Sequence, residues 1–158
     1  MQPTSHGPSV RALILPVLLL LLSLNPGALL HAASLSGQVL AVLTGDRLVI
    51  TNDLGERRAV RLLGILAARP DSPDGRRAHR YLRGLLAGKF VRLDYHRLTP
   101  EGEPQGTLLH GGADIGLRLL ESGLVRFKDD PALPAPLRLR YRDAQAAAHR
   151  GRLGIWSK

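Results

Sequence analysis

The chain has no cysteine, and aromatic residues make up only 4% of its 158 residues. Without cysteine there can be no disulfide framework, no zinc site built on thiolates and no lipoprotein attachment point. The few aromatic side chains leave little material for the stacking platforms on which single-stranded nucleic acids are usually bound. The domain must therefore be held together by an aliphatic core, and its binding surfaces must rely on groups other than aromatic rings.

Long hydrophobic runs are also scarce. The one clear run, from Ala12 to Leu24, follows a weakly basic start and is too short to span a bilayer comfortably. Small residues follow at Ala32 and Ala33. We therefore predict that residues 1–32 are a signal peptide cleaved near Ala32 or Ala33, leaving one domain over 33–158 in the periplasm or outside the cell. No stable membrane span is expected after cleavage; the alternative is an uncleaved N-terminal membrane anchor.

Negative charge is in short supply. The chain has 22 Lys and Arg residues against 13 Asp and Glu; without Arg11, the only charged residue of the leader, 21 remain and the formal charge is +8. Such a surplus favours polyanions such as nucleic acid, anionic lipid headgroups or acidic envelope polymers. Arginine greatly outnumbers lysine, which coding bias would explain as well as phosphate binding. Charge alone thus predicts attraction to anions and nothing narrower.

The alternation of apolar and polar residues predicts five short strands, and a helical spacing of apolar residues predicts three helices. The expected strands are Val39–Leu43, Leu48–Asn52, Arg57–Leu63, Phe90–Tyr95 and Thr107–His110. The expected helices are Arg76–Leu86, Asp114–Glu121 and Leu137–Arg150. One helix after the third strand and two after the fifth are typical of a mainly β protein, an OB-type barrel with three flanking helices.

Three short motifs occur in a characteristic order: Thr44–Asp46 on a turn, Arg61–Ile65 at the end of the third strand, and Gly154–Trp156 near the C-terminus. Their order and spacing resemble the staphylococcal nuclease-like (thermonuclease) family. The resemblance runs from about Gly37 to Trp156 and implies a five-stranded OB-fold barrel with three flanking helices. It also implies a calcium-dependent nuclease ancestry.

The resemblance implies that the catalytic positions are degenerate. Members of the family hold calcium with two aspartates, orient or deprotonate the attacking water with a glutamate, and contact the phosphate with two arginines. Here Asp46 keeps the first carboxylate and Arg61 keeps the first arginine. Leu66 stands at the second metal-binding aspartate, Arg69 at the glutamate and Gln105 at the second arginine. We therefore predict no intact catalytic set, no metal site and no cofactor.

Several of these assignments leave alternatives open. Asp46 can equally be a hairpin-turn residue, and Arg61 can be a phosphate clamp or can pair with Asp46. A different alignment of the preceding loop moves the second arginine position from Gln105 to Thr107. The residues at the family's base-stacking positions are Asp129 and Pro131, which cannot stack.

Basic stripes on two helices are the remaining candidates for contact with nucleic acid. Arg76, Arg80 and Arg83 are spaced to share one face of the first helix, and Arg138 and Arg142 one face of the last. Solvated helix faces are the alternative interpretation.

The sequence thus predicts an exported, non-catalytic domain, a pseudoenzyme that binds an anionic polymer, DNA or RNA included, or another envelope protein. One alternative is an active calcium-dependent phosphodiesterase acting on DNA or RNA, with calcium as its cofactor. A second alternative is a structural protein-interaction domain.

Overall fold

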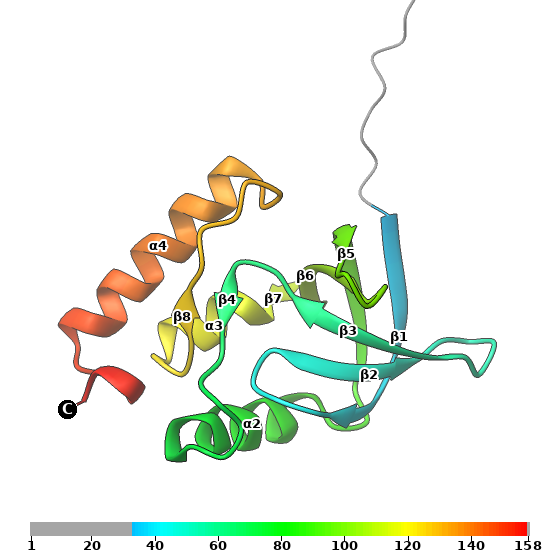
Figure 1. Ribbon diagram of the computed structural model, residues 1–158, viewed down its shortest axis with the longest axis horizontal. Helices are drawn as coiled ribbons and strands as arrows, with labels where there is room; N and C mark the ends of the chain where they lie inside the picture. Colours follow the sequence, from blue (N-terminus) through cyan, green and yellow to red (C-terminus); the bar gives the residue numbers. More distant parts are fainter. Residues whose placement is uncertain (1–32, 158) are drawn as a thin grey trace, which may run out of the picture. The chain divides into compact units, whose positions relative to one another are not determined.

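The computed structural model describes residues 33–157, so the predicted signal peptide lies outside the described residues. Five strands form a closed barrel in the order β3-β2-β1-β5-β6 (Figure 1). They are β1 (Ala33–Val42), β2 (Arg47–Thr51), β3 (Arg57–Leu62), β5 (Phe90–Leu98) and β6 (Pro104–His110). The predicted mainly β fold with a five-stranded barrel and three helices is confirmed at this level.

The barrel is closed by a short parallel pairing between β3 and β6. Arg61 lies beside Gln105, and Leu62 beside Gly106, while all other barrel pairs are antiparallel. The amide of Leu63 continues this ladder by donating to the carbonyl of Gly106 at 2.8 Å. Because parallel pairing cannot be made by a hairpin, the chain reaches β6 only after a helix and β5 have intervened.

Alternation along the strands fills the barrel with aliphatic side chains. Leu48 and Ile50 on β2, Val60 on β3, Leu93 on β5 and Leu108 on β6 are all almost completely buried. Their neighbours along each strand point outward, as the period of two requires. This is the aliphatic core expected of a domain without disulfides.

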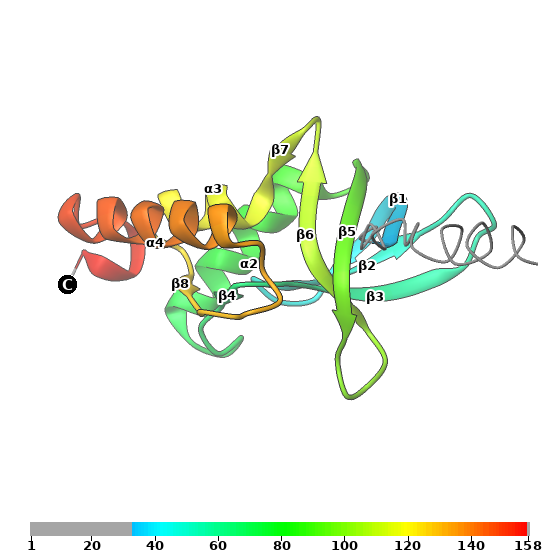
Figure 2. The same cartoon turned by 90° about the horizontal axis from the view of Figure 1, so that it is seen from above.

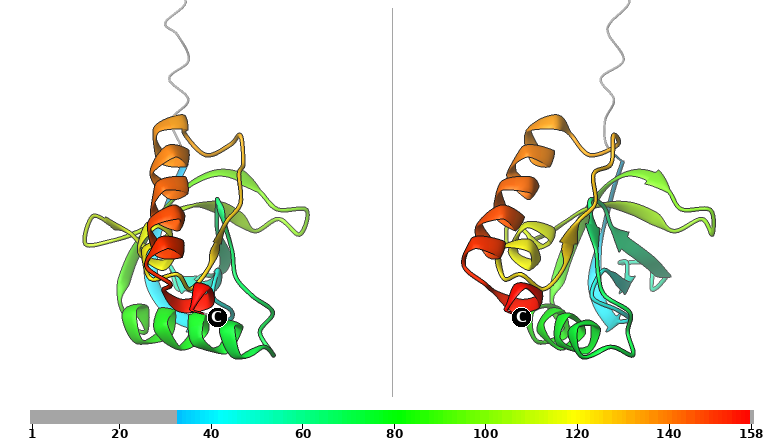
Figure 3. Two further views of the ribbon diagram at one scale, coloured as in Figure 1. Left: turned by 90° about the vertical axis from the view of Figure 1, so that its left-hand side faces the viewer. Right: turned by 60° about the vertical axis from the view of Figure 1, so that its left-hand side comes forward.

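The first helix, α2 (Pro73–Leu86), begins three residues before the predicted Arg76, because Ser72 caps it by accepting a hydrogen bond from the amide of Gly75 at 3.0 Å. Ala78, Leu82 and Leu86 are buried and cover one end of the barrel (Figure 3). The helical spacing of Tyr81 places it on the same side as these residues, yet it is 38% exposed. Its large ring lies at the edge of the buried stripe.

The other two helices are α3 (Ile115–Glu121) and α4 (Ala135–Arg150), which pack against each other beside the barrel (Figure 2). Tyr141, Ala144 and Ala148 form the buried stripe of α4, and Leu137 at its start is partly buried. Asp114 caps α3 as predicted, accepting from the amide of Leu117 at 3.0 Å. No helix in the described part of the chain is both long and apolar enough to cross a membrane.

Small elements not predicted from the sequence join the helices to the barrel. A two-stranded sheet pairs β4 (Ile65–Leu66) with β8 (Arg126–Phe127), and β7 (Ala113–Asp114) extends β6 at its edge. A 3-10 turn, η2 (Gly154–Trp156), ends the described chain. Trp156 contacts His149 of α4 edge-on at 5.0 Å between ring centroids, and its ring lies under the guanidinium of Arg126. Trp156 therefore packs against both α4 and β8.

A buried hydrogen bond links α4 to the start of α3. The hydroxyl of Tyr141 donates to the carboxylate of Asp114, 2.8 Å from one oxygen and 3.0 Å from the other. Burial raises the pKa of the Asp114 carboxyl, against the opposing effect of its hydrogen bonds from Leu117 and Tyr141. Burial, reinforced by the neighbouring carboxylate, also raises the pKa of Tyr141.

Gly106→Ala should weaken barrel closure. A Cβ at this position would collide with the backbone of Asp94 and Tyr95 on β5, so the variant should lose about 3 kcal/mol of unfolding free energy. The matched control is Gly84→Ala on α2, where a Cβ meets nothing within 4 Å; it should gain about 1 kcal/mol from helix propensity. Urea unfolding of both variants measures the difference, and equal effects would contradict the closure argument.

Asp114→Asn should change how stability depends on pH. Because the folded-state pKa of Asp114 is raised, the folded state binds the proton of this carboxyl more tightly than the unfolded state does. The contribution of Asp114 to the stability of the domain therefore falls as pH rises above about 4. The stability of the wild type relative to Asp114→Asn should therefore fall over that range. Denaturant unfolding at a series of pH values measures this difference; a relative gain in wild-type stability with rising pH would contradict it.

Candidate functional site

Arg61, which the resemblance would make a phosphate-contacting residue, lies in a row of polar groups on the outside of the barrel. Antiparallel pairing places Arg47 of β2 directly opposite Arg61 of β3, and the parallel closure places Gln105 of β6 on the other side of Arg61. These residues lie near one end of their strands, where the β1–β2 turn and the β5–β6 hairpin meet. The closure therefore brings together one retained and one replaced family position.

Arg61 is half-buried and incompletely satisfied. Its Nε is buried and has no hydrogen-bond partner. Within residues 33–157 no ion pair joins it to Asp46. Its charge contributes to lowering the pKa of the exposed Glu101 carboxyl, although the main cause there is a hydrogen bond from Thr99. The ion pair with Asp46, one of the two roles considered for Arg61, is therefore absent among residues 33–157.

Asp46 is engaged by its own turn. The hydroxyl of Thr44 donates to its carboxylate at 2.7 Å, and its backbone carbonyl accepts from the amide of Leu62 at 2.9 Å. Gly45 beside it is packed so tightly against Ala78 and Ala67 that a Cβ there would collide with Ala78. Asp46 therefore has the contacts of a turn residue that docks the β1–β2 turn onto the end of β3.

The two replaced positions that follow β3 face solvent. Leu66 is 51% exposed and pairs with Arg126 across the β4–β8 sheet. Arg69 has a side chain that is 83% exposed and pairs with Asp71 at 2.8 Å, so its charge is directed to the neighbouring loop. Where the resemblance leads one to expect two acids, this side of the candidate site has Leu66 beside Arg126, and Arg69 already paired with Asp71.

Gln105 is tied into a second ion-pair arrangement. Its side-chain oxygen accepts from Nε of Arg97 at 3.0 Å, and Arg97 in turn pairs with the buried Asp130 at 2.7 Å. The amide of Ala132 also donates to Asp130. Arg97 therefore provides a cation next to the position where the family carries its second arginine, although its charge is balanced.

Sequence reasoning missed the ion pair between Arg47 and Glu103 at the site. Nε of Arg47 donates to the carboxylate at 3.0 Å, and a terminal guanidinium nitrogen makes a second contact. The Glu103 residue is only 8% exposed, and its hydrogen bond is the main cause that raises the pKa of Arg47. The hairpin register could have revealed Arg47 opposite Arg61, but nothing in the sequence pairs it with a residue 56 positions away.

The predicted basic stripes lie apart from this row in the sequence and are largely solvated. Arg80 and Arg83 are exposed, and Arg76 donates to the backbone carbonyl of Asp71. On α4, Arg142 is exposed and Arg138 lies 4.0 Å from Asp129. Such contacts are typical of solvated helix faces, the alternative interpretation of the two basic stripes.

The donor set does not fit calcium. Calcium takes six to eight oxygen ligands and is usually held by several carboxylates. Of the three acidic family positions only Asp46 keeps a carboxylate, and that group already accepts a hydrogen bond from Thr44. Among residues 33–157, no three His, Cys, Asp or Glu side chains are grouped so that they could hold a metal ion.

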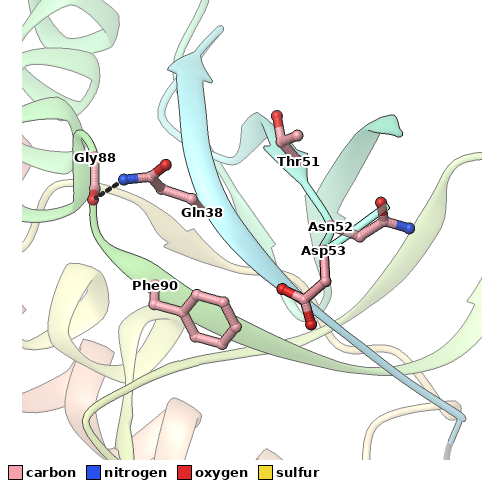
Figure 4. Close-up of a pocket in the computed structure, with 6 residues that line it drawn as sticks. All are labelled: Gln38, Thr51, Asn52, Asp53, Gly88 and Phe90. Atoms are coloured by element: carbon pink, nitrogen blue, oxygen red, sulfur yellow. Dashed lines mark hydrogen bonds between the residues drawn. The ribbon is translucent and has the colours of Figure 1, made fainter. Parts of the chain in front are cut away.

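A hollow of about 340 Å³ lies elsewhere on the barrel, lined in part by Gln38, Asn52, Asp53 and Phe90 (Figure 4). The amide of Gln38 donates across it to the carbonyl of Gly88 at 2.9 Å. It sits at the end of β2 and the start of β5, opposite to the ends that carry Arg47 and Arg97. It has no basic lining residue and does not extend the row around Arg61.

Comparison with known proteins adds no family assignment. No protein-family model matches the chain, and no curated protein matches it in sequence. The function must therefore be argued from the fold and from the groups described above.

Glu103→Gln should destabilise the domain and strengthen anion binding. It removes the carboxylate that compensates Arg47; because that guanidinium is partly exposed, the loss should be only about 1–2 kcal/mol. The freed cation then adds to Arg61. The control is Glu56→Gln, which removes an exposed pair with Arg58 and should change stability by less than about 0.5 kcal/mol. Urea unfolding and anion titration measure the two effects, and an unchanged affinity for anions would contradict the assignment of this row.

Proposed function

We propose that this is an exported, non-catalytic domain with a staphylococcal nuclease-like OB-fold that binds linear anionic polymers through the row Arg47, Arg61 and Arg97. The single observation that carries the proposal is Arg61, a half-buried arginine whose Nε has no partner inside the protein. An unsatisfied buried donor costs stability. An anion on the outer face of β3 would compensate the charge of this guanidinium.

The arrangement of the strands supports the fold part of the proposal. A first strand shared between β2 and β5, with a parallel closure between the third and fifth barrel strands, is the strand order of an OB-type barrel. Proteins with this barrel commonly bind oligonucleotides on the face of the second and third strands. Here that face carries Arg47 opposite Arg61 and Arg57 opposite Thr51.

The chemistry of the row supports binding without hydrolysis. Guanidinium groups recognise phosphate and carboxylate oxygens through paired hydrogen bonds. Phosphodiester cleavage would also need a group to activate water, and position 69 is an arginine already paired with Asp71. No aromatic side chain takes part in the row, so binding should depend on backbone charge and not on base identity.

The test is fluorescence anisotropy of a labelled 20-nucleotide single strand, followed by an assay for cleavage with and without calcium. We expect salt-sensitive binding with no cleavage in either condition. Calcium-dependent cleavage that is lost in Asp46→Ala would contradict the proposal and identify a nuclease. The absence of binding to DNA, RNA and polyphosphate at low salt would also contradict it, and would favour an envelope protein as the partner.

Arg61→Gln should weaken binding to the single strand about 3- to 10-fold at low salt. Loss of one phosphate contact should also reduce the slope of log affinity against log salt by about 0.7. Lys89→Gln is the charge-matched control: Lys89 is exposed and precedes β5, at the opposite end of that strand from Arg97. If Lys89→Gln has the same effect, net charge and not the row explains the affinity.

The triple variant Arg76→Gln, Arg80→Gln and Arg83→Gln distinguishes the barrel face from α2. If the row is the site, removing these three charges should lower affinity less per charge than Arg61→Gln does. A larger effect per charge would move the site to α2 and contradict the assignment to the barrel.

A further inference from the structure

A separate hollow of about 410 Å³ lies between the barrel wall and the two C-terminal helices. Its lining comes from β6, β7, α3 and the first turns of α4. This volume falls within the range of small-molecule sites, roughly 300–1,000 Å³. Arg47, Arg61 and Arg97 do not line it, so it shares no side chain with the site proposed above.

One part of the hollow is apolar. Leu109 of β6, Leu117 of α3 and Leu137 of α4 line it from three different elements. None of the three is fully buried in the core. They offer a surface against which a small aliphatic group would be removed from water, gaining about 25 cal/mol per Å² of apolar area.

The remainder of the lining carries two positive and two negative charges. Arg118 and Arg140 have no ion pair within the described residues, although the charge of Arg140 opposes the rise in the pKa of the Asp114 carboxyl; Glu121 has neither an ion pair nor a side-chain hydrogen bond there. Asp114 differs, since its carboxylate accepts hydrogen bonds from Tyr141 and Leu117. Arg118 and Glu121 are one helical turn apart and are spaced to pair with each other, yet no such pair forms.

The side chain of Thr107 also points to a ligand in this hollow. It lines the hollow from β6, is 8% exposed, and its hydroxyl is buried with no hydrogen-bond partner. A buried unpaired hydroxyl is costly, and rotation about χ1 exchanges it with the methyl group that shares its Cβ. An occupant of the hollow would provide the partner that the protein does not.

We propose that this hollow binds a small zwitterion with an aliphatic side chain, the chemistry of an apolar α-amino acid. The carboxylate is held by the guanidinium groups of Arg118 and Arg140, and the ammonium group by Glu121. The side chain lies on the three leucines. A lining with balanced charge favours such a dipolar ligand over a simple anion, which the two carboxylates would repel.

The test is an NMR titration of the domain with three probes of nearly equal size. Leucine has both charges, N-acetyl-leucine has only the carboxylate and resembles a peptide C-terminus, and leucinamide has only the ammonium group and resembles a peptide N-terminus. We expect leucine to shift the amides of Thr107, Leu109 and Gly112 and to bind at least fivefold more tightly than the other two. Equal binding of all three, tighter binding of either single-charge probe, or no shift with 20 mM leucine would overturn the proposal.

Two variants assign the charges. Glu121→Gln should abolish the preference for leucine over N-acetyl-leucine, and Arg140→Gln should weaken both of these while leaving leucinamide unchanged. The control, Arg142→Gln, lies two residues further on α4 and does not line the hollow, so it should leave all three affinities unchanged. Loss of leucine binding in the control to the same extent as in Arg140→Gln would count against the site.

Thr107→Val provides a test that does not depend on charge. The substitution keeps the shape and removes the unpaired hydroxyl, so the Tm without ligand should rise while leucine binding weakens. Unchanged leucine affinity would show that the hydroxyl is not part of the site and would overturn its role as a ligand group.

Discussion

The short parallel pairing of β3 with β6 is the contact on which the rest of the domain depends. Only two residue pairs take part, Arg61 with Gln105 and Leu62 with Gly106, yet they convert a five-stranded sheet into a closed barrel. Gly106 is needed because β5 runs so close to it that any Cβ would meet the backbone of Asp94. Closure buries Leu62 and Leu108 in the same core and at the same time fixes which polar side chains meet outside. The site is therefore a consequence of how the barrel closes.

Closure and hairpin register also create an electrostatic problem on the outer face. Arg47 and Arg61 lie directly opposite each other, and like charges in this position are destabilising. Glu103 compensates Arg47, and Asp130 compensates Arg97. Nothing comparable compensates Arg61 within the described chain, and its Nε is buried without a partner. An anion that binds from outside, as proposed above, would compensate this charge.

Whether a feature of the fold or of the candidate site could be predicted from the sequence depends on how far apart in the chain the residues that determine it lie. Alternation along β2 and the helix that follows Asp114 are determined by neighbouring residues, and the sequence predicted both; it placed the start of α2 three residues late, at Arg76. The β4–β8 sheet could not be foreseen, because two-residue strands such as Ile65–Leu66 have no period to detect. The ion pairs of Arg47 and Arg97 join residues 56 and 33 positions apart, and no local pattern indicates such partners. Tyr81 has helical spacing that favours burial, yet it is 38% exposed.

Strand β6 shows why two different surfaces can coexist on so small a domain. Its first residues pair with β3 where the barrel closes, so Gln105 lies beside Arg61 of the row. Two and four residues later, on the same outward face, Thr107 and Leu109 line the hollow beside α3 and α4. The change of neighbour along this one face follows from the end of the β3 pairing at Gly106 and the return of the chain through β7. The hydrogen bond between Asp114 and Tyr141 anchors α3 to α4 beside this strand. A ligand in the hollow would therefore contact both helices and the strand that closes the barrel. Occupancy of the hollow should therefore stabilise the same closure that positions Arg61, even though the two surfaces share no side chain.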